Sequence, residues 1–181
     1  MRIVRKHWRK AVTSGLLLVL IVSGSFVFWA GSEIASPPRR PLMDYHREFL
    51  TNQAGHGMHI DSFTAGDGTP CIVVTPAGEP GERGVIIRKQ LAERGLSLPS
   101  FGQIIGTLVL THGRKGRKED YLPIAERLCA AGFRCVIPDL PGHGDHPANI
   151  ATYGVREAGL PGRMLNETSQ KFGFDPQPAG L

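Results

Sequence analysis

His112, Gly113 and Arg114 are the residues of this chain whose types and order most directly suggest chemistry. They follow an apolar run, residues 104–111, of the kind that forms a parallel strand covered on both faces. Acyl transfer needs N–H donors aimed at the oxygen that becomes negative in the tetrahedral intermediate. A turn directly after a central strand can present such donors, with Gly113 permitting tight geometry. The alternative is a simple strand-to-helix turn with no ligand.

A run of mostly basic residues, 114–118, follows this turn. It lacks the Gly-x-x-x-x-Gly-Lys-Ser/Thr pattern of a phosphate-binding loop, and the spacing from Gly113 to Gly116 is too short for one. We therefore expect a solvent-exposed charge run at the start of a helix. The alternative is that these cations help to select an anionic substrate at the mouth of a site.

Two groups of histidines raise the question of a metal site. His143, Asp145 and His146 lie on a loop rich in glycine and proline. Such a loop lacks the helical or strand geometry that would aim three ligands at one point. We therefore predict no metal ligands and no cofactor in this chain. For His56 and His59 we expect a position at the surface or in a turn.

The three cysteines, Cys71, Cys129 and Cys135, each fall inside an expected strand or helix. An odd number leaves at least one free thiol even in an oxidising compartment. No Cys-x-x-Cys pair or zinc-type spacing is present. We therefore expect the cysteines to act as small buried side chains.

Strands and helices alternate along the chain, which predicts an α/β fold. Strands are expected at 57–64, 68–76, 104–111 and 133–138, and helices at 43–50, 82–94, 118–131 and 163–172. Apolar residues in 118–131 recur every three or four positions, as on one face of a helix. Gly132 suits the left-handed end of that helix. Residues 179–181 have the character of the first residues of a further strand.

The stretch from Gly106 to Pro147, GTLVLTHGRKGRKEDYLPIAERLCAAGFRCVIPDLPGHGDHP, resembles the N-terminal half of the α/β-hydrolase core. The similarity is to serine hydrolases of the serine aminopeptidase type. It implies a partial α/β-hydrolase fold, in which an antiparallel hairpin leads into a parallel sheet flanked by helices. By this analogy, the third strand lies between the fourth and the fifth.

The same resemblance implies roles for individual residues. Gly113 and Arg114 would form the oxyanion-hole backbone, with the N–H of Arg114 as the donor. His112 would pack against this loop and orient it. Residues 139–144, which match the family's Asp-x-Pro-Gly-His-Gly, would form a structural loop near the site.

The nucleophile, acid and base of that family have no match in this sequence. The family places them in the order Ser, Asp/Glu, His, with the serine in a Gly-x-Ser-x-Gly turn after the fifth strand. Ser169 has no glycines at the required positions, and His143 and His146 precede any nucleophile. We therefore expect residues 57–181 to be the first half of a longer fold, with the apolar strand at 104–111 left as an open edge.

The N-terminus combines a basic cap, residues 1–10, with 21 uncharged residues, 11–31. About 20 mainly apolar residues cross a bilayer core. Basic residues on one side predict a cytoplasmic N-terminus and a globular domain on the outer or periplasmic side. We predict an uncleaved transmembrane signal anchor, because the run exceeds the roughly 7–15 apolar residues of a signal peptide. Secretion after signal cleavage is the alternative.

The basic cap also explains the net charge of +5. Five Lys and Arg residues lie in it, and the other basic residues equal the acidic ones in number. The charge therefore predicts no nucleic-acid partner. Residues 32–42, rich in proline, are expected to link the anchor to a domain at 43–181.

These patterns together predict a membrane-anchored α/β-hydrolase acting on an ester, thioester or amide. Its serine nucleophile is expected beyond Leu181, so the chain alone would lack the triad. Two alternatives belong to other classes. One is a non-catalytic, membrane-tethered binding module, and the other is a transferase or peroxidase on the same fold. Fold alone does not separate these chemistries.

Overall fold

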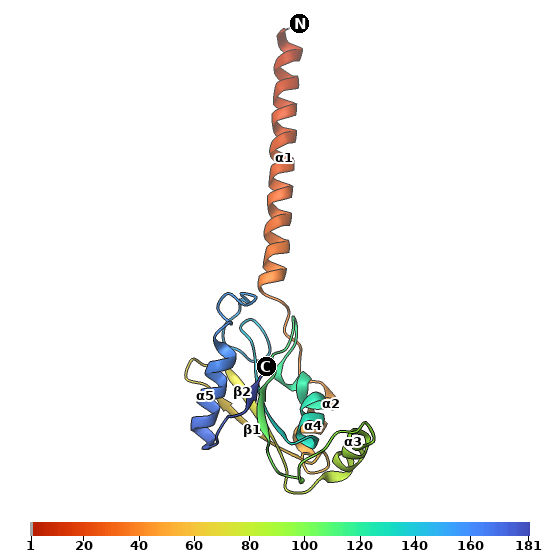
Figure 1. The fold of residues 1–181 in the computed structure, drawn as a ribbon. Coiled ribbons are helices and arrows are strands. Elements are labelled where there is room, and N and C mark those ends of the chain that lie inside the picture. Colours follow the sequence, from red (N-terminus) through yellow and green to blue (C-terminus); the bar gives the residue numbers. More distant parts are fainter. Residues whose placement is uncertain (1) are drawn as a thin grey trace.

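A computed structural model describes residues 2–181. Met1, the first residue of the predicted basic cap, lies outside the described residues, as do the side chains of residues 1–7, 9 and 11. A long apolar helix, α1 (Arg2–Ala35), leads into a mixed α/β domain from which it projects (Figure 1). By length and composition, the segment Val12–Ala35 could cross a membrane, and a signal sequence would meet the same criteria.

The domain is built on a five-stranded mixed sheet with the order β1-β2-β4-β3-β5. The antiparallel part consists of β1 (Met58–Thr64), β2 (Pro70–Pro76) and β4 (Phe133–Pro138). β3 (Gly106–Val109) runs parallel to β4 and to the two-residue β5 (Ala179–Gly180). The predicted position of the third strand, between the fourth and the fifth, is confirmed.

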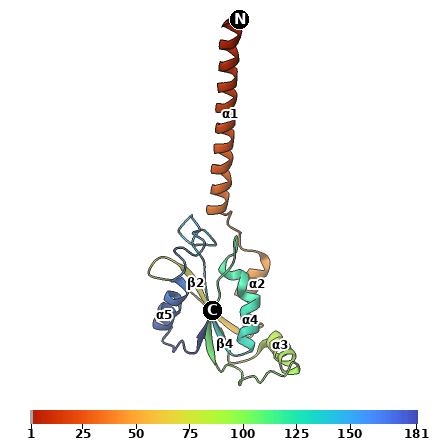
Figure 2. The ribbon, with the colours of Figure 1, turned by 45° about the horizontal axis from the view of Figure 1, so that its top comes forward.

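Helices cover both faces of this sheet (Figures 1 and 2). α2 (Asp44–Thr51), α3 (Gly81–Glu93) and α4 (Leu122–Ala130) lie on one side, and α5 (Leu160–Phe172) lies on the other. A single 3-10 turn, η1 (Lys118–Tyr121), precedes α4. The helices flanking the sheet thus enclose two separate cores.

Alternation along the central strands divides the apolar side chains between these cores. On β2, Ile72 and Val74 face α2 and α4, whereas Cys71 faces α5. On β4, Ile137 likewise faces α2 and α4, whereas Val136 faces α5. Both strands are apolar on both faces because both faces are covered, as in a buried sheet. At full burial, each such side chain contributes about 1.5–3 kcal/mol.

The predicted elements are all present, with shifts at their ends. β3 is shorter than the predicted 104–111, and β5 covers its far edge over two residues, Thr107 and Leu108. α5 begins three residues before the predicted 163, because Pro161 is accommodated in its first turn. α1 continues beyond the predicted 31 to Ala35, so the linker begins later.

The expectation that residues 114–118 form a solvent-exposed charge run is wrong for its last two members. Arg117 and Lys118 are buried. The Lys118 ammonium lies 2.8 Å from a carboxylate oxygen of Asp139 and 2.7 Å from Asp145. Burial alone would lower the pKa of Lys118, but Asp139, Asp145 and Glu119 outweigh it and raise that pKa. These cations are therefore structural, while Arg114 and Lys115 stay exposed.

His56 lies in the turn before β1, as one of the two expectations had it, but it is buried rather than at the surface, whereas His59 is exposed as predicted. The His56 ring is buried and stacks on Phe49. Its Nδ1 lies 2.6 Å from Glu126, and its Nε2 lies 2.8 Å from Glu48. This histidine therefore links α2 to α4 on the face of the sheet that these two helices cover.

Asp139 offers a direct test of how the domain is held together. Its side chain is fully buried and accepts bonds from the Lys118 backbone N–H and ammonium and from the Asp145 N–H. Replacing one partner of a buried ion pair leaves the other charge buried and unpaired, which lowers the stability of the fold. We expect Asp139→Asn to lower the free energy of unfolding in urea by about 3 kcal/mol. The fully exposed carboxylate of Asp44 provides the control, because an ion pair in water contributes little and Asp44→Asn should leave the free energy of unfolding nearly unchanged. Equal losses for the two variants would contradict this assignment.

Candidate functional site

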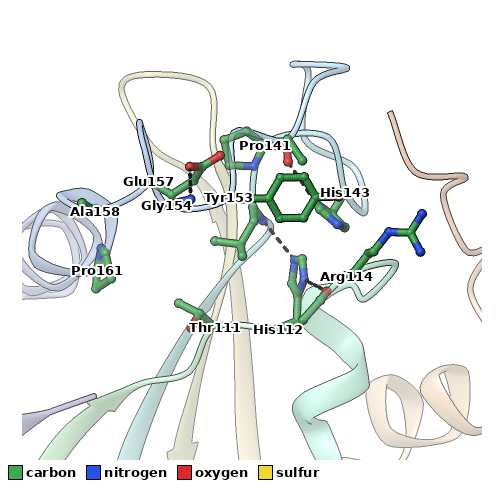
Figure 3. Close-up of a pocket in the computed structure, with 13 residues that line it drawn as sticks. Thr111, His112, Arg114, Pro141, His143, Tyr153, Gly154, Glu157, Ala158 and Pro161 are labelled. Atoms are coloured by element: carbon green, nitrogen blue, oxygen red, sulfur yellow. Dashed lines mark hydrogen bonds between the residues drawn. The ribbon is translucent and has the colours of Figure 1, made fainter. Parts of the chain in front are cut away.

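A cavity of about 370 Å³ lies where β3 and β4 end (Figure 3). This is the side of the domain from which α1 projects (Figure 1). Three loops form its walls. The lining residues are Thr111, His112, Gly113, Arg114, Leu140, Pro141, His143, Ala151, Tyr153, Gly154, Glu157, Ala158 and Pro161. Its size is within the range of small-molecule sites, about 300–1,000 Å³. All three sequence-predicted site residues, 112, 113 and 114, therefore meet at one cavity.

The loop after β3 presents backbone donors at this cavity. Within residues 2–181, no atom accepts a hydrogen bond from the N–H of Gly113, Arg114 or Lys115. The loop closes on itself through a bond from the Gly116 N–H to the Gly113 carbonyl, at 3.0 Å. Free N–H groups at the carboxyl end of a central strand are the feature an oxyanion-binding loop requires. Their use as oxyanion donors stays a prediction.

Gly113 is not the glycine on which the shape of this turn depends, contrary to the sequence expectation. It is outside the left-handed region, and a Cβ there would meet no atom within 4 Å. At Gly116, by contrast, a Cβ would lie 2.9 Å from the His112 side chain. Lys115 takes the left-handed conformation, with φ of 62°, which is uncommon outside glycine. The smallness of Gly113 therefore leaves open space beside the cavity.

His112 holds the loop in place. Its Nδ1 lies 3.0 Å from the Gly113 carbonyl, and its Nε2 accepts a hydrogen bond from the Leu140 N–H, also at 3.0 Å. The ring must therefore be neutral, with its proton on Nδ1. Burial lowers the pKa of His112 below its ordinary value, although the Gly113 carbonyl and Asp139 partly oppose this. Figure 3 shows the ring joining the loops that follow β3 and β4.

His143 brings an unsatisfied polar atom to the same cavity. Its Nδ1 lies 2.9 Å from the Pro141 carbonyl, which can only accept, so this nitrogen carries the proton. In the neutral ring, Nε2 is then an acceptor. This atom is buried and has no hydrogen-bond partner among the described residues. Buried polar atoms are nearly always satisfied, so this unpaired nitrogen is an exception in the wall of the cavity.

The third wall, residues 151–161, escaped sequence analysis because its pattern is weak. Glu157 organises it by accepting hydrogen bonds from the Thr152 hydroxyl and from the N–H groups of Thr152 and Gly154. Burial would raise the pKa of Glu157, but these bonds lower it to about 2. Tyr153, in the left-handed region with φ of 49°, extends its ring across the cavity (Figure 3). In the sequence, this segment is marked only by residues that break regular structure, Gly154, Gly159 and Pro161.

The cavity holds no nucleophile paired with a base among the residues that the structure describes. The three cysteines are buried, as predicted, and none forms a disulfide; burial raises the pKa of Cys71 to about 12. Such thiols are poor nucleophiles. Ser169 is on α5 and bonds to the Asn166 carbonyl. No group of three or more potential metal ligands occurs in the described part of the chain.

The fold and the site together define a mixed α/β protein with a ligand-sized cavity at the carboxyl end of its parallel strands. Open α/β sheets bind ligands at this end. Comparison with protein-family models and with curated proteins found no match to this chain.

The neutral state required of His112 generates a pH prediction. The unfolded chain binds a proton near pH 6.5, whereas the folded chain binds it only at lower pH. Folded stability should therefore fall as the pH drops below about 6.5, because the unfolded state binds more protons. We expect the detergent-solubilised protein to lose more unfolding free energy between pH 7.5 and 5 than its His112→Asn variant. His59→Asn, at an exposed site, should follow the wild-type curve. Parallel curves for His112→Asn and wild type would refute the prediction.

Proposed function

We propose that this chain supplies the anchor and the oxyanion half-site of a membrane-bound α/β-hydrolase acting on an ester, thioester or amide. The observation that carries the proposal is the pair of free backbone N–H groups, on Gly113 and Arg114, that line a cavity where a central parallel strand ends. The strand order β1-β2-β4-β3-β5, which matches the implied arrangement of the third, fourth and fifth strands, supports it.

The chemistry proposed for these donors follows from acyl transfer. A serine hydroxyl, contributed by sequence after Leu181, forms a bond to the carbonyl carbon while its proton passes to a histidine. The carbonyl π electrons move to oxygen, and the resulting oxyanion accepts a hydrogen bond from the Arg114 N–H. Collapse expels the alcohol, thiol or amine with the proton from histidine, and water then releases the acid. One such donor accelerates the reaction by about 10²–10³-fold.

The membrane part of the proposal rests on α1. Its uncharged stretch, 11–31, is about 31 Å long at 1.5 Å per residue, which matches a hydrocarbon core of about 30 Å. The basic residues before it favour a cytoplasmic N-terminus. The end of α1 also bonds to the domain through its Ala35 carbonyl, which accepts from the Ala151 N–H. This contact favours a retained anchor over a cleaved signal sequence.

A serine-reactive fluorophosphonate tests the proposal directly. The reading frame is continued past codon 181, expressed in membranes and labelled, and the adduct is mapped by peptide mass spectrometry. We expect one modified serine in a Gly-x-Ser-x-Gly turn shortly after Leu181. Residues 1–181 expressed alone provide the negative control. If the longer protein is neither labelled nor able to hydrolyse a soluble ester, the hydrolase proposal fails.

Gly113→Ala separates a role in the site from a role in folding. A methyl group there meets no atom within 4 Å, so the free energy of unfolding should change by less than about 1 kcal/mol. The methyl would occupy space needed by the reacting carbonyl, so we expect kcat/KM to fall about 10- to 100-fold. Gly78→Ala is the matched control, because a Cβ there is equally free and Gly78 does not line the cavity. Equal activity of the two variants would remove Gly113 from the site.

A binding module is the second candidate, and one observation favours it. The cavity is lined by Gly113 and Arg114, whose N–H groups have no acceptor among the described residues, and those residues provide no nucleophile beside them. Such a site can bind without reacting. The absence of fluorophosphonate labelling together with retained ligand binding would select this candidate over the hydrolase.

A further inference from the structure

The wall of the cavity holds the end of the apolar helix. The last carbonyls of a helix have no partners within it. Here three of them accept from residues that line the cavity. The Arg114 guanidinium donates to the Glu33 carbonyl at 3.1 Å, the Tyr153 hydroxyl to the Ile34 carbonyl, and the Ala151 N–H to the Ala35 carbonyl at 2.8 Å. The cavity therefore lies directly at the point where α1 ends.

Distance along α1 places this point relative to a bilayer. The uncharged segment ends at Gly31, and four further residues to Ala35 add about 6 Å. The headgroup layer on each side of the hydrocarbon is about 5–8 Å thick. If α1 spans a membrane, the residues bonded to its end lie within the headgroup layer. The cavity mouth then meets lipid rather than bulk water.

The loop at this depth carries apolar side chains that the domain does not cover. Ile150 is 58% exposed, Tyr153 54% and Val155 85%. Arg156 in the same loop is exposed, as are Arg114 and Lys115 in the loop after β3. Apolar residues with cations around them are the composition of segments that lie in a membrane interface. The bonds to Glu157 hold the loop in a defined shape, in which Val155 is exposed.

We propose that residues 150–155 are embedded in the headgroup layer and that the cavity takes its substrate from the bilayer, as an amphiphile with an acyl chain. The substrate class rests on the proposed hydrolase function, whereas the position of the loop does not. The chain of the amphiphile would enter past Tyr153. Its polar head would meet the free N–H groups of Gly113 and Arg114, which line the cavity.

The position of the loop is measured without any reaction. Val155→Cys carries an environment-sensitive fluorophore in the full protein, reconstituted in vesicles of phosphatidylcholine and phosphatidylglycerol. Val85→Cys is the matched control, because it is also exposed but lies on α3, at the far end of the domain from α1 (Figure 1). We expect nitroxide-headgroup lipids to quench the probe at 155 and not at 85. The native cysteines are buried, and the protein without an added cysteine gives their background.

The substrate class is measured with two esters in the protein extended past codon 181. We expect Val155→Asp to slow hydrolysis of vesicle-borne umbelliferyl oleate about fivefold, the effect of one charge at an anionic surface, and to leave soluble umbelliferyl acetate unchanged. Val85→Asp should change neither rate.

The outcomes separate the two proposals. No quenching at 155 overturns the interfacial loop. Quenching at 155 with equal oleate rates for Val155→Asp and wild type overturns bilayer delivery while the hydrolase stands. If neither ester is hydrolysed, the hydrolase proposal and the substrate class fall together, and quenching at 155 still establishes the loop in the interface.

Discussion

The buried carboxylate of Asp139 is the constraint on which the site depends. It lies at the end of β4, and the Lys118 backbone N–H and ammonium bind it from the start of η1. The loop after β4 folds tightly over it, because a Cβ at Gly144 would lie 2.1 Å from its oxygen. The next residue, Leu140, donates its N–H to His112. One charge thus fixes the helix start and the loop after β4, and through Leu140 it orients the loop after β3.

A second constraint comes from the end of α1, which lies outside the sheet. A helix end needs partners for its last carbonyls, and α1 finds them on residues of the cavity wall. The same side chains therefore serve two purposes. Arg114 contributes its backbone to the predicted donor loop and its guanidinium to the helix end, and Tyr153 both crosses the cavity and bonds to α1 (Figure 3).

Sequence patterns predicted the elements well because burial on both faces leaves a strong apolar signal, as at 71–74 and 135–137. The contacts of residues outside the regular elements, or at their ends, were harder to predict from the sequence. Lys118 has the composition of a surface residue, and only the fold reveals the carboxylate of Asp139, 21 residues away, that compensates its burial. His56 likewise depends on Glu126, 70 residues distant. The resemblance located residues 112–114, but it attributed to Gly113 a conformational need that belongs to the neighbouring Lys115 and Gly116.

These contacts also bear on whether α1 is kept. Cleavage before Ser36 would remove the carbonyls of residues 33–35 and leave their three donors without acceptors. For the buried Ala151 N–H, the loss of its partner would cost about 1–3 kcal/mol unless water replaced it. Arg114 and Tyr153 are exposed and would lose less. The three hydrogen bonds therefore make the stability of the cavity wall depend on the presence of residues 33–35.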